Sequence, residues 1–542
     1  MRGGFIRVNS WLNNKNLLFS LLSGILLILI FPGFNFEILA WVSLVPLFIA
    51  TRKTSPLASL KLGFIAGLVF FLGVIYWIVI AMTKYGGIPM AIGIAVLILL
   101  SGYLAIYVSI FTYLLSLTPY SLKYILAPFL WVTLELIRAH FLTGFPWASL
   151  GYSQFKTLPI IQAADITGVY GISFIIVMVN AAIASFIESI TPFHPPLSKG
   201  GSGGVRQFAT KYMIVTTLFI ISFSIYGYWR MNLFNSQLTT HNSQLKVALI
   251  QGNIEQNMKW DESYQSDVFD AHVNLTMQAS REKPDLIVWP ESATPFYFQA
   301  DRNFRPKMIE LAKNSGSFIL FGTPGYEIKD NGIVSYNRAY LLSREGDVVG
   351  KYDKIHLVPF GEYVPLRKIL FFIDKMVEGV GEYQSGEEYT IFEIRNPKSE
   401  IQNFFGTLIC FEVIFPDLVR RFVKNGAEFL VNITNDGWYG KTAASSQHIA
   451  MVAFRAVENR VPVVRAANTG ISGIIEPTGK IAKETDIFVT TYVTGEINTG
   501  LLQKTFYTQY GDVFAYICSM ATIFLVMLSR YAKNDNYRTA SL

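Results

Sequence analysis

Three residues in the C-terminal half of the chain have the side chains that acyl transfer requires. Glu291 lies in WPES at the end of an apolar run, Lys354 ends KYDK, and Cys410 lies in the middle of the apolar run GTLICFEV. A thiolate attacks a carbonyl, and a carboxylate takes the thiol proton and later returns it to a leaving group. An ammonium stabilises the oxyanion of the tetrahedral intermediate. Together these residue types indicate acyl transfer through a covalent thioester.

The runs that carry these residues are predicted to be strands of one α/β domain. Strands buried on both faces are typically apolar and β-branched, and such segments span 246–253, 285–292, 318–324, 407–413, 428–436 and 461–468. Helical spacing occurs at 264–281, 305–314 and 445–459, and 335–354 is predicted to be a hairpin that turns at Glu345-Gly346-Asp347. This alternation predicts a layered sheet core, with Cys410 and Glu412 on one strand. Because ligands gather at strand ends in such sheets, we expect these ends and the NDGW turn at 435–438 to converge.

The N-terminal part of the chain has the composition of a membrane protein. Apolar residues make up 51% of the sequence and charged residues 15%, and the mean hydropathy is +0.37. One crossing takes ~20 residues, and the candidate spans are 17–32, 38–51, 60–82, 90–117, 123–139, 165–188, 212–229 and 513–529. We interpret the first run as a span because Phe31-Pro32-Gly33 offers no cleavage site for a signal peptidase. The second run is short and contains Pro46.

The chain is therefore predicted to have three parts. A transmembrane helical domain of about seven spans occupies 1–230, a catalytic domain occupies 231–512, and a last transmembrane helix with a tail occupies 513–542. Basic residues are concentrated in the connections on one side of the predicted spans, which places both termini in the cytoplasm and 231–512 on the periplasmic side. The linker 192–207 is rich in Pro, Gly and Ser. The net charge of +7 is modest and no basic tract is interleaved with aromatics, so no nucleic acid partner is expected.

The two cysteines of the chain have different predicted roles. Cys410 is an unpaired thiol on the oxidising side of the membrane, and a nearby ammonium is expected to lower its pKa and favour the thiolate. Cys518 lies inside the last predicted span and is interpreted as a small apolar residue. No group of His and Cys has metal-ligand spacing, so no metal or other cofactor is expected.

Several motifs together resemble a known family. WPESATP, KYDKIHLVPFGEYVP, GTLICFEVIFPD and NDGWYG resemble the nitrilase or carbon–nitrogen hydrolase superfamily, and LELIRAHFLTGFPWASLGYSQ at 134–154 extends the resemblance to its apolipoprotein N-acyltransferase family. The resemblance implies an α-β-β-α sandwich beside a bundle of about eight membrane helices. It also implies a triad in which Glu291 is the general base, Lys354 the oxyanion lysine and Cys410 the nucleophile.

The same resemblance assigns supporting residues around the triad. Glu362 matches a second glutamate that supports the site, and Glu412 matches an acidic residue just after the nucleophile. Trp260 and Trp438 match aromatic residues near the substrate. Phe411 stands where the family often has a tyrosine, so we expect it to contact substrate without contributing a hydroxyl group.

The resemblance further implies a reaction between two lipids of a bacterial inner membrane. A phospholipid would leave its acyl chain on Cys410, and the chain would pass to the N-terminal amino group of a diacylglyceryl-cysteine lipoprotein in a ping-pong sequence. The membrane spans support this independently, because both substrates reside in the bilayer. A monomer is expected.

Other interpretations of the sequence remain open. The chain is alternatively a membrane-tethered amidase that hydrolyses a small amide, or a non-catalytic transporter or scaffold. Among single residues, Glu362 could pair with Arg367, Glu412 with Arg465, Trp438 could pack on the domain core, and His448 could cap a helix. The amphipathic segment 366–377 is either a lid that docks on the membrane or a helix packed on its own domain.

Overall fold

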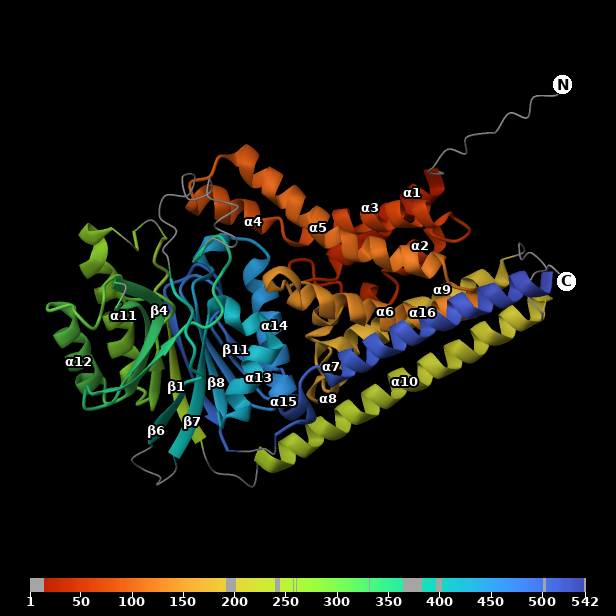
Figure 1. The fold of residues 1–542 in the computed structure, drawn as a ribbon. Coiled ribbons are helices and arrows are strands. Elements are labelled where there is room, and N and C mark those ends of the chain that lie inside the picture. Colours follow the sequence, from red (N-terminus) through yellow and green to blue (C-terminus); the bar gives the residue numbers. More distant parts are fainter. Residues whose placement is uncertain are drawn as a thin grey trace.

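A computed structural model describes residues 14–191, 201–238, 244–256, 258–259, 261–330, 332–363, 383–395, 402–500 and 504–540. Long helices form a bundle at one end of the molecule, and two six-stranded sheets lie at the other end (Figure 1). Trp260, Arg367 and the segment 366–377 lie outside the described residues.

Six helices in the described part of the chain are long and apolar enough to cross a membrane. They are α3 (Pro56–Val74), α5 (Met90–Ser116), α6 (Tyr120–His140), α9 (Val169–Ile190), α10 (Gly201–Leu238) and α16 (Val513–Ala540). The first two predicted spans are shorter, because α1 covers Asn14–Leu29 and the next run is divided into η1 (Glu37–Trp41) and α2 (Val45–Ala50). Pro46 lies in the first turn of α2, where a proline begins a helix easily. The count of eight spans stays a prediction.

The predicted span 60–82 is not one helix. Helix α3 ends at Val74, and α4 (Trp77–Ile80) and the π-helical turn η2 (Ala81–Tyr85) follow it. After this break the chain reaches the sheets. The ring of Trp77 in α4 lies 4.7 Å from the ring of Tyr439, which is in the turn that follows β8. Figure 1 shows α4 beside the sheets rather than within the bundle.

The two sheets form the sandwich that the sequence predicted. The first sheet has the order β12-β1-β2-β3-β4-β5 and the second β11-β10-β9-β8-β7-β6. Strands β1 (Gln244–Gln251), β2 (Leu286–Val288) and β3 (Phe318–Lys329) are parallel, as are β7 (Gln402–Ile409), β8 (Phe429–Thr434) and β9 (Val463–Ala467). These six are the predicted strands. The remaining strands are β4 (Gly332–Leu342), β5 (Val348–Asp353), β6 (Ile391–Arg395), β10 (Gly473–Ile475), β11 (Ile481–Glu484) and β12 (Thr491–Asn498).

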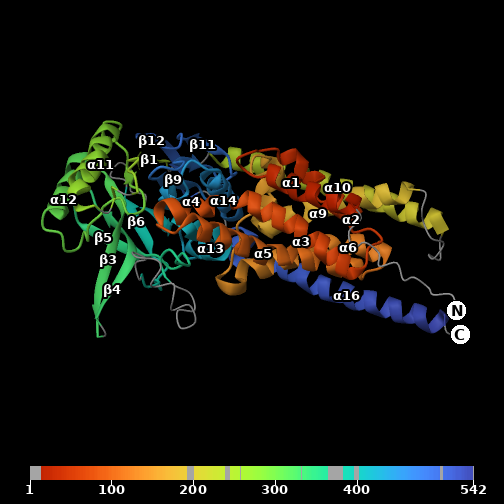
Figure 2. The same ribbon diagram turned by 90° about the horizontal axis from the view of Figure 1, so that it is seen from above.

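The layers on either side of the sheets explain why the parallel strands are rich in apolar residues. Helices α11 (Gln265–Ser280) and α12 (Phe304–Ser315) cover the first sheet, and α13 (Pro416–Lys424) and α14 (Ala444–Asn459) cover the second (Figures 1 and 2). Every residue of β8 is buried, as expected for a strand covered on both faces. The predicted hairpin is confirmed as the antiparallel pair β4 and β5. Shorter helices connect these elements: α7 (Leu158–Ile161), α8 (Ala164–Thr167), α15 (Phe506–Tyr510), η3 (Phe141–Thr143), η4 (Leu150–Gln154), η5 (Glu262–Tyr264), η6 (Cys410–Ile414) and η7 (Asp436–Tyr439).

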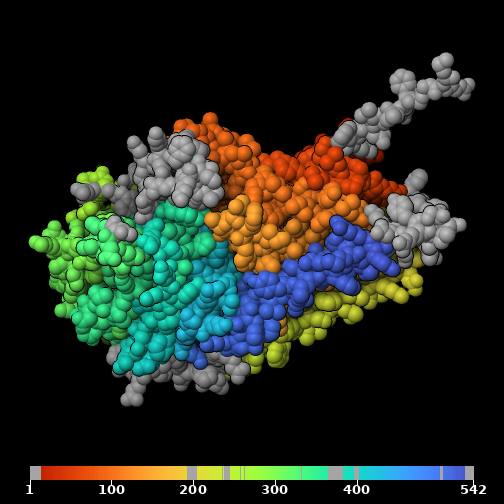
Figure 3. Space-filling view, viewed as in Figure 1, coloured from red at the N-terminus to blue at the C-terminus, as the bar shows by residue number. Residues whose placement is uncertain are grey.

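Buried polar contacts attach the second sheet's helices to the bundle. The Gln447 Oε1 atom on α14 accepts hydrogen bonds from the indole nitrogens of Trp77 (3.2 Å) and Trp147 (2.7 Å). Just after α14, Arg460 pairs with Asp165 of α8 at 2.9 Å. The space-filling view shows the cyan and blue parts of the chain meeting the orange helices along a continuous surface (Figure 3). These contacts hold the sheets in a fixed position relative to the membrane helices.

Candidate active site

Four strand ends meet at one place, as predicted. Glu291 follows β2, Lys354 follows β5, Cys410 follows β7 and Asn435 follows β8. The Lys354 Nζ atom lies 3.6 Å from Glu291 Oε1, and the Asn435 backbone N–H donates to Glu291 Oε2 at 2.9 Å. These side chains come from both sheets, so the sandwich itself assembles the site.

Close packing of strand β3 fixes the turn that carries Glu291. A Cβ atom at Gly322 of β3 would lie 2.8 Å from the Glu291 Cα atom and 2.7 Å from the Ser292 backbone nitrogen. Only glycine leaves room for this approach. The backbone of β3 in turn accepts the N–H of Ala293 at 2.9 Å, which holds the turn against the sheet.

The expected position of Cys410 within a strand is wrong. Strand β7 ends at Ile409, and Cys410 is the first residue of the 3₁₀ turn η6. Its φ angle is +53°, a left-handed conformation that costs a non-glycine residue about 1–3 kcal/mol. In this turn the Cys410 side chain no longer follows the alternation of side chains between the two faces of a strand, yet the residue is only 6% exposed. The apolar sequence FEVI is compatible with a strand and with a buried turn, so the sequence could not distinguish them.

The surroundings of the Cys410 thiol favour its protonated form. Burial raises the pKa of Cys410, the negative charge of Glu291 raises it further, and the positive charge of Lys354 opposes them. The net pKa is raised, contrary to the expectation that the lysine would lower it. A protonated thiol that acts as a nucleophile must lose its proton, and a nearby carboxylate is a group that can take it.

The raised pKa predicts how Cys410 should react with an alkylating agent. In a Cys518→Ala background, the rate of iodoacetamide labelling should be low at pH 7 and should rise with pH without a plateau below pH 9, because only the thiolate reacts. Intact-mass spectrometry of timed samples measures the rate. A rate that is already maximal at pH 7 would contradict the raised pKa.

Lys354 is a buried cation between two carboxylates. Its side chain is 1% exposed, and Nζ donates to Glu362 Oε1 at 2.9 Å. Burial lowers the pKa of Lys354, but Glu362 and Glu291 outweigh burial and raise it overall. The side chain is therefore an ammonium at neutral pH and can stabilise an oxyanion.

Glu362 and Asn337 connect the general-base candidate to the lysine. Asn337 Nδ2 donates to Glu291 Oε1 at 2.8 Å and to Glu362 Oε1 at 2.7 Å. The contact of Glu362 with Lys354 agrees with its predicted supporting position, whereas the alternative partner Arg367 lies outside the described residues. Asn337 was not identified from the sequence. The only signal for it is an amide among the buried residues of β4.

Glu412 accepts hydrogen bonds from a tyrosine hydroxyl and from backbone N–H groups and does not form an ion pair with any described residue. Its Oε1 accepts from the Tyr352 hydroxyl (2.7 Å) and the Ile355 N–H (2.7 Å), and its Oε2 accepts from the Ile409 N–H (2.7 Å). The carboxylate therefore ties the chain around Lys354 to the turn of Cys410. The alternative pairing with Arg465 is wrong.

Arg465 has another buried partner. It donates to Asp436 Oδ2 at 2.8 Å, and His448 Nδ1 lies 3.2 Å from Asp436 Oδ1. His448 lies within α14, so it does not cap that helix; it belongs to a buried polar cluster with Asp436 and Arg465. The cluster fixes η7, which begins directly after Asn435.

The predicted substrate-contact residues are placed differently from one another. Phe411 is buried, with its ring 5.2 Å from that of Phe415. Trp438 is 38% exposed and has its edge toward Tyr85 of η2, 6.2 Å away, so it does not pack in the domain core. Trp260 lies outside the described residues. Trp438 is therefore positioned where the sheets meet the membrane helices.

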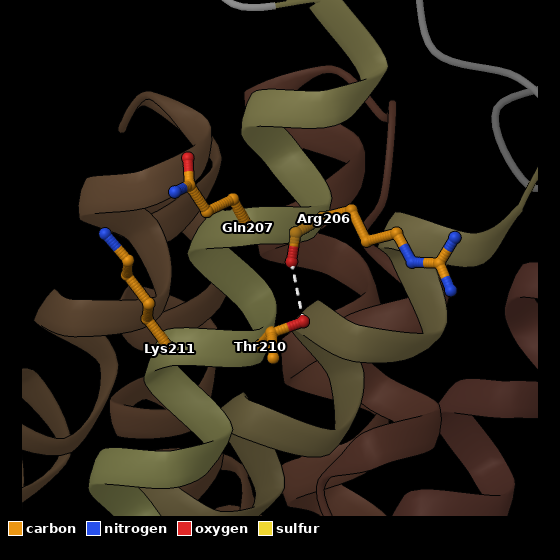
Figure 4. Close-up of a pocket in the computed structure, with 4 residues that line it drawn as sticks. All are labelled: Arg206, Gln207, Thr210 and Lys211. Carbon is orange, nitrogen blue, oxygen red and sulfur yellow. Dashed lines mark hydrogen bonds between the residues drawn. The ribbon is translucent and has the colours of Figure 1, made fainter.

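An open hollow on α10 is not a candidate for catalysis. It is lined by Arg206, Gln207, Thr210 and Lys211, all on one helix (Figure 4). Its hydrogen bond from Thr210 Oγ1 to the Arg206 carbonyl, at 2.9 Å, lies within the helix. Lysine and arginine side chains without a nearby base or thiol offer no nucleophile. Within the described residues, no three His, Cys, Asp or Glu side chains gather as around a metal ion.

Comparisons with known proteins agree with this architecture. Residues 23–182 match the family described as apolipoprotein N-acyltransferase N-terminal domain, and residues 246–507 match the carbon-nitrogen hydrolase family. The solved structure of Nit3 from Saccharomyces cerevisiae, a member of the nitrilase superfamily, is 18% identical, with a TM-score of 0.36 over 48% of this chain and 92% of that chain.

Two curated relatives match over most of their length. An apolipoprotein N-acyltransferase of Geobacter metallireducens is 41% identical over 528 residues, 97% of this chain and 97% of that protein. An apolipoprotein N-acyltransferase of Rickettsia typhi is 31% identical over 489 residues, 88% of this chain and 91% of that protein. With its membrane helices, its two-sheet sandwich and this similarity along nearly its whole length, the chain belongs to the apolipoprotein N-acyltransferase family.

Proposed function

We propose that this protein transfers a fatty acyl chain from a membrane phospholipid to the N-terminal amino group of a diacylglyceryl-cysteine lipoprotein, through a thioester on Cys410. The observation that carries the proposal is the placement of Cys410 on a left-handed turn, where the Glu291 carboxylate and the buried Lys354 ammonium both act on its thiol, in a domain fixed to membrane helices. Each of the three groups has a role in acyl transfer that its position allows.

The first half-reaction forms the thioester. The Cys410 sulfur attacks the ester carbonyl carbon while Glu291 takes the thiol proton, and the carbonyl oxygen becomes an oxyanion that Lys354 stabilises. The intermediate then breaks its carbon–oxygen ester bond. Glu291 returns the proton to the departing oxygen, and a lysophospholipid leaves.

The second half-reaction consumes the thioester. The neutral amine of the lipoprotein attacks the thioester carbonyl, and Glu291 takes a proton from the amine nitrogen. The carbon–sulfur bond breaks, the amide remains on the lipoprotein, and the thiolate regains its proton from Glu291. A buried site limits the loss of the acyl group to water, which this step requires.

We further propose that the sheets lie on the periplasmic side of a bacterial inner membrane, with both termini in the cytoplasm. The distribution of basic residues among the connections supports this orientation. In addition, α16 ends at the end of the bundle that lies away from the sheets (Figure 1). One chain supplies Glu291, Lys354 and Cys410, so a monomer suffices for the reaction.

A test uses purified protein, a phospholipid and a synthetic diacylated lipopeptide with a free N-terminal amine. We expect the lipopeptide to gain the mass of one acyl chain, with equimolar lysophospholipid released, and rates at varied concentrations of both substrates to fit ping-pong kinetics. A lipopeptide with a blocked N-terminus is the control. Release of free fatty acid or ammonia without a modified lipopeptide would indicate an amidase or lipase and contradict the proposal.

A further inference from the structure

A second buried lysine at the site has no part in the mechanism above. Lys259 lies between β1 and α11, and its side chain is 1% exposed. Its Nζ atom donates to the backbone carbonyl of Glu291 at 2.8 Å. Lysine is almost never fully buried unless its charge is compensated, so this position needs an explanation.

The bond from Lys259 completes the set of contacts that hold Glu291. Asn337 Nδ2 and the Asn435 N–H hold the two carboxylate oxygens, and Lys259 holds the main chain of the same residue. The next residue, Ser292, has a φ angle of +46°, so the turn is not in a relaxed conformation. A fixed main chain at this point sets the direction of the carboxylate.

The charge of Lys259 also acts on the reacting groups. Lys259 interacts electrostatically with Glu291 and with Cys410. Lys354 and Asp436 also act on the Cys410 thiol, Tyr439 interacts with it electrostatically, and His448 contacts the Cys410 backbone. His272 also faces Lys259, and because its pKa is lowered to about 4, mainly by burial, it is neutral. Burial lowers the pKa of Lys259 itself to about 8, so the amine is mostly protonated at pH 7.

We propose that Lys259 is a positioning residue for the acyl transfer: its ammonium clamps the main chain of Glu291, so that the carboxylate faces Cys410, and its positive charge favours the thiolate as the proton leaves. This inference rests on the proposed function of Glu291 and Cys410.

The test compares variants of Lys259 in the full-length protein, all in a Cys518→Ala background. Lys259→Gln and Lys259→Met remove the charge, and Lys259→Arg keeps it. Lys480→Gln is the matched control, because that side chain is 59% exposed. For each variant we measure the pH profile of iodoacetamide labelling of Cys410, the rate of lipopeptide acylation, and the melting temperature.

We expect both neutral variants to move the labelling profile to higher pH. Labelling at pH 7, where Lys259 is mostly protonated, should slow about tenfold if the profile moves by one pH unit, because the thiolate fraction falls by that factor. Lipopeptide acylation should fall at least about tenfold, because a displacement of 1 Å can cost about a hundredfold. Lys259→Arg should keep the original profile, and Lys480→Gln should change nothing.

A neutral variant that keeps the original labelling profile would overturn the proposal, even if its melting temperature falls, because the role would then be structural only. If Lys259→Met does not fold, Lys259→Gln decides the question with a smaller change in polarity. Failure of the proposed function is distinguishable. If the parent protein does not acylate the lipopeptide, the labelling profile, which needs no substrate, still tests the influence of Lys259 on the thiol.

Discussion

Replacing Cys410 by alanine is expected to abolish a covalent acyl-enzyme. When the unmodified protein is mixed with phospholipid and no acceptor, its intact mass should rise by one fatty acyl group, and hydroxylamine should remove that group because it cleaves thioesters. Cys410→Ala should show no adduct and no acyl transfer. The reason is that a methyl side chain cannot attack the ester.

Cys518→Ala is the matched control for this experiment. Cys518 is buried and lies on α16, a different element from the turn that carries Cys410. Its variant should form the adduct at the same rate as the parent protein. An adduct that survives in Cys410→Ala, or disappears in Cys518→Ala, would contradict the assignment of the nucleophile.

Loss of either Glu291 or Lys354 is expected to reduce turnover by at least about a hundredfold, the usual scale for a general base or an oxyanion donor. Glu291→Gln keeps the size of the side chain and one oxygen that can accept from Asn337 or Asn435. It removes the proton acceptor and one of these two hydrogen bonds. Lys354→Met removes the cation that faces both Glu362 and Glu291. The two variants therefore test the base and the oxyanion donor separately.

Their effects on stability should differ. Glu291→Gln should melt close to the parent protein. Lys354→Met should melt at a lower temperature, because it leaves two buried carboxylates near each other without a cation. Rates should be measured well below both melting temperatures. Two separate substitutions at exposed positions, Glu282→Gln and Lys480→Met, are the controls. Near-normal turnover in a folded variant would remove that residue from the mechanism.

Much of this architecture follows from local patterns in the sequence. The runs 246–253, 285–292 and 428–436 are rich in apolar residues because both faces of β1, β2 and β8 are covered, and such a run is recognisable without knowing what covers it. Membrane helices such as α5 and α9 are recognisable because their apolar runs are long enough to cross a membrane. Glu291 stands out because it follows an apolar run, Lys354 because it ends the predicted hairpin, and Cys410 because it is a thiol inside an apolar run.

Only the tertiary structure decided which buried polar groups meet. Glu412 accepts from Tyr352 and Ile355 instead of pairing with Arg465, and Asn337 and Lys259 join the site from distant segments. Hydrophobic periodicity records whether a residue is buried but not its partner, because the partner comes from another strand or sheet. The turn at Cys410 could not be predicted from composition either. A buried turn and a buried strand have similar apolar compositions. The φ of +53° at Cys410 separates them, and Glu412 ties this turn to Ile409 within it and to Ile355 of another segment.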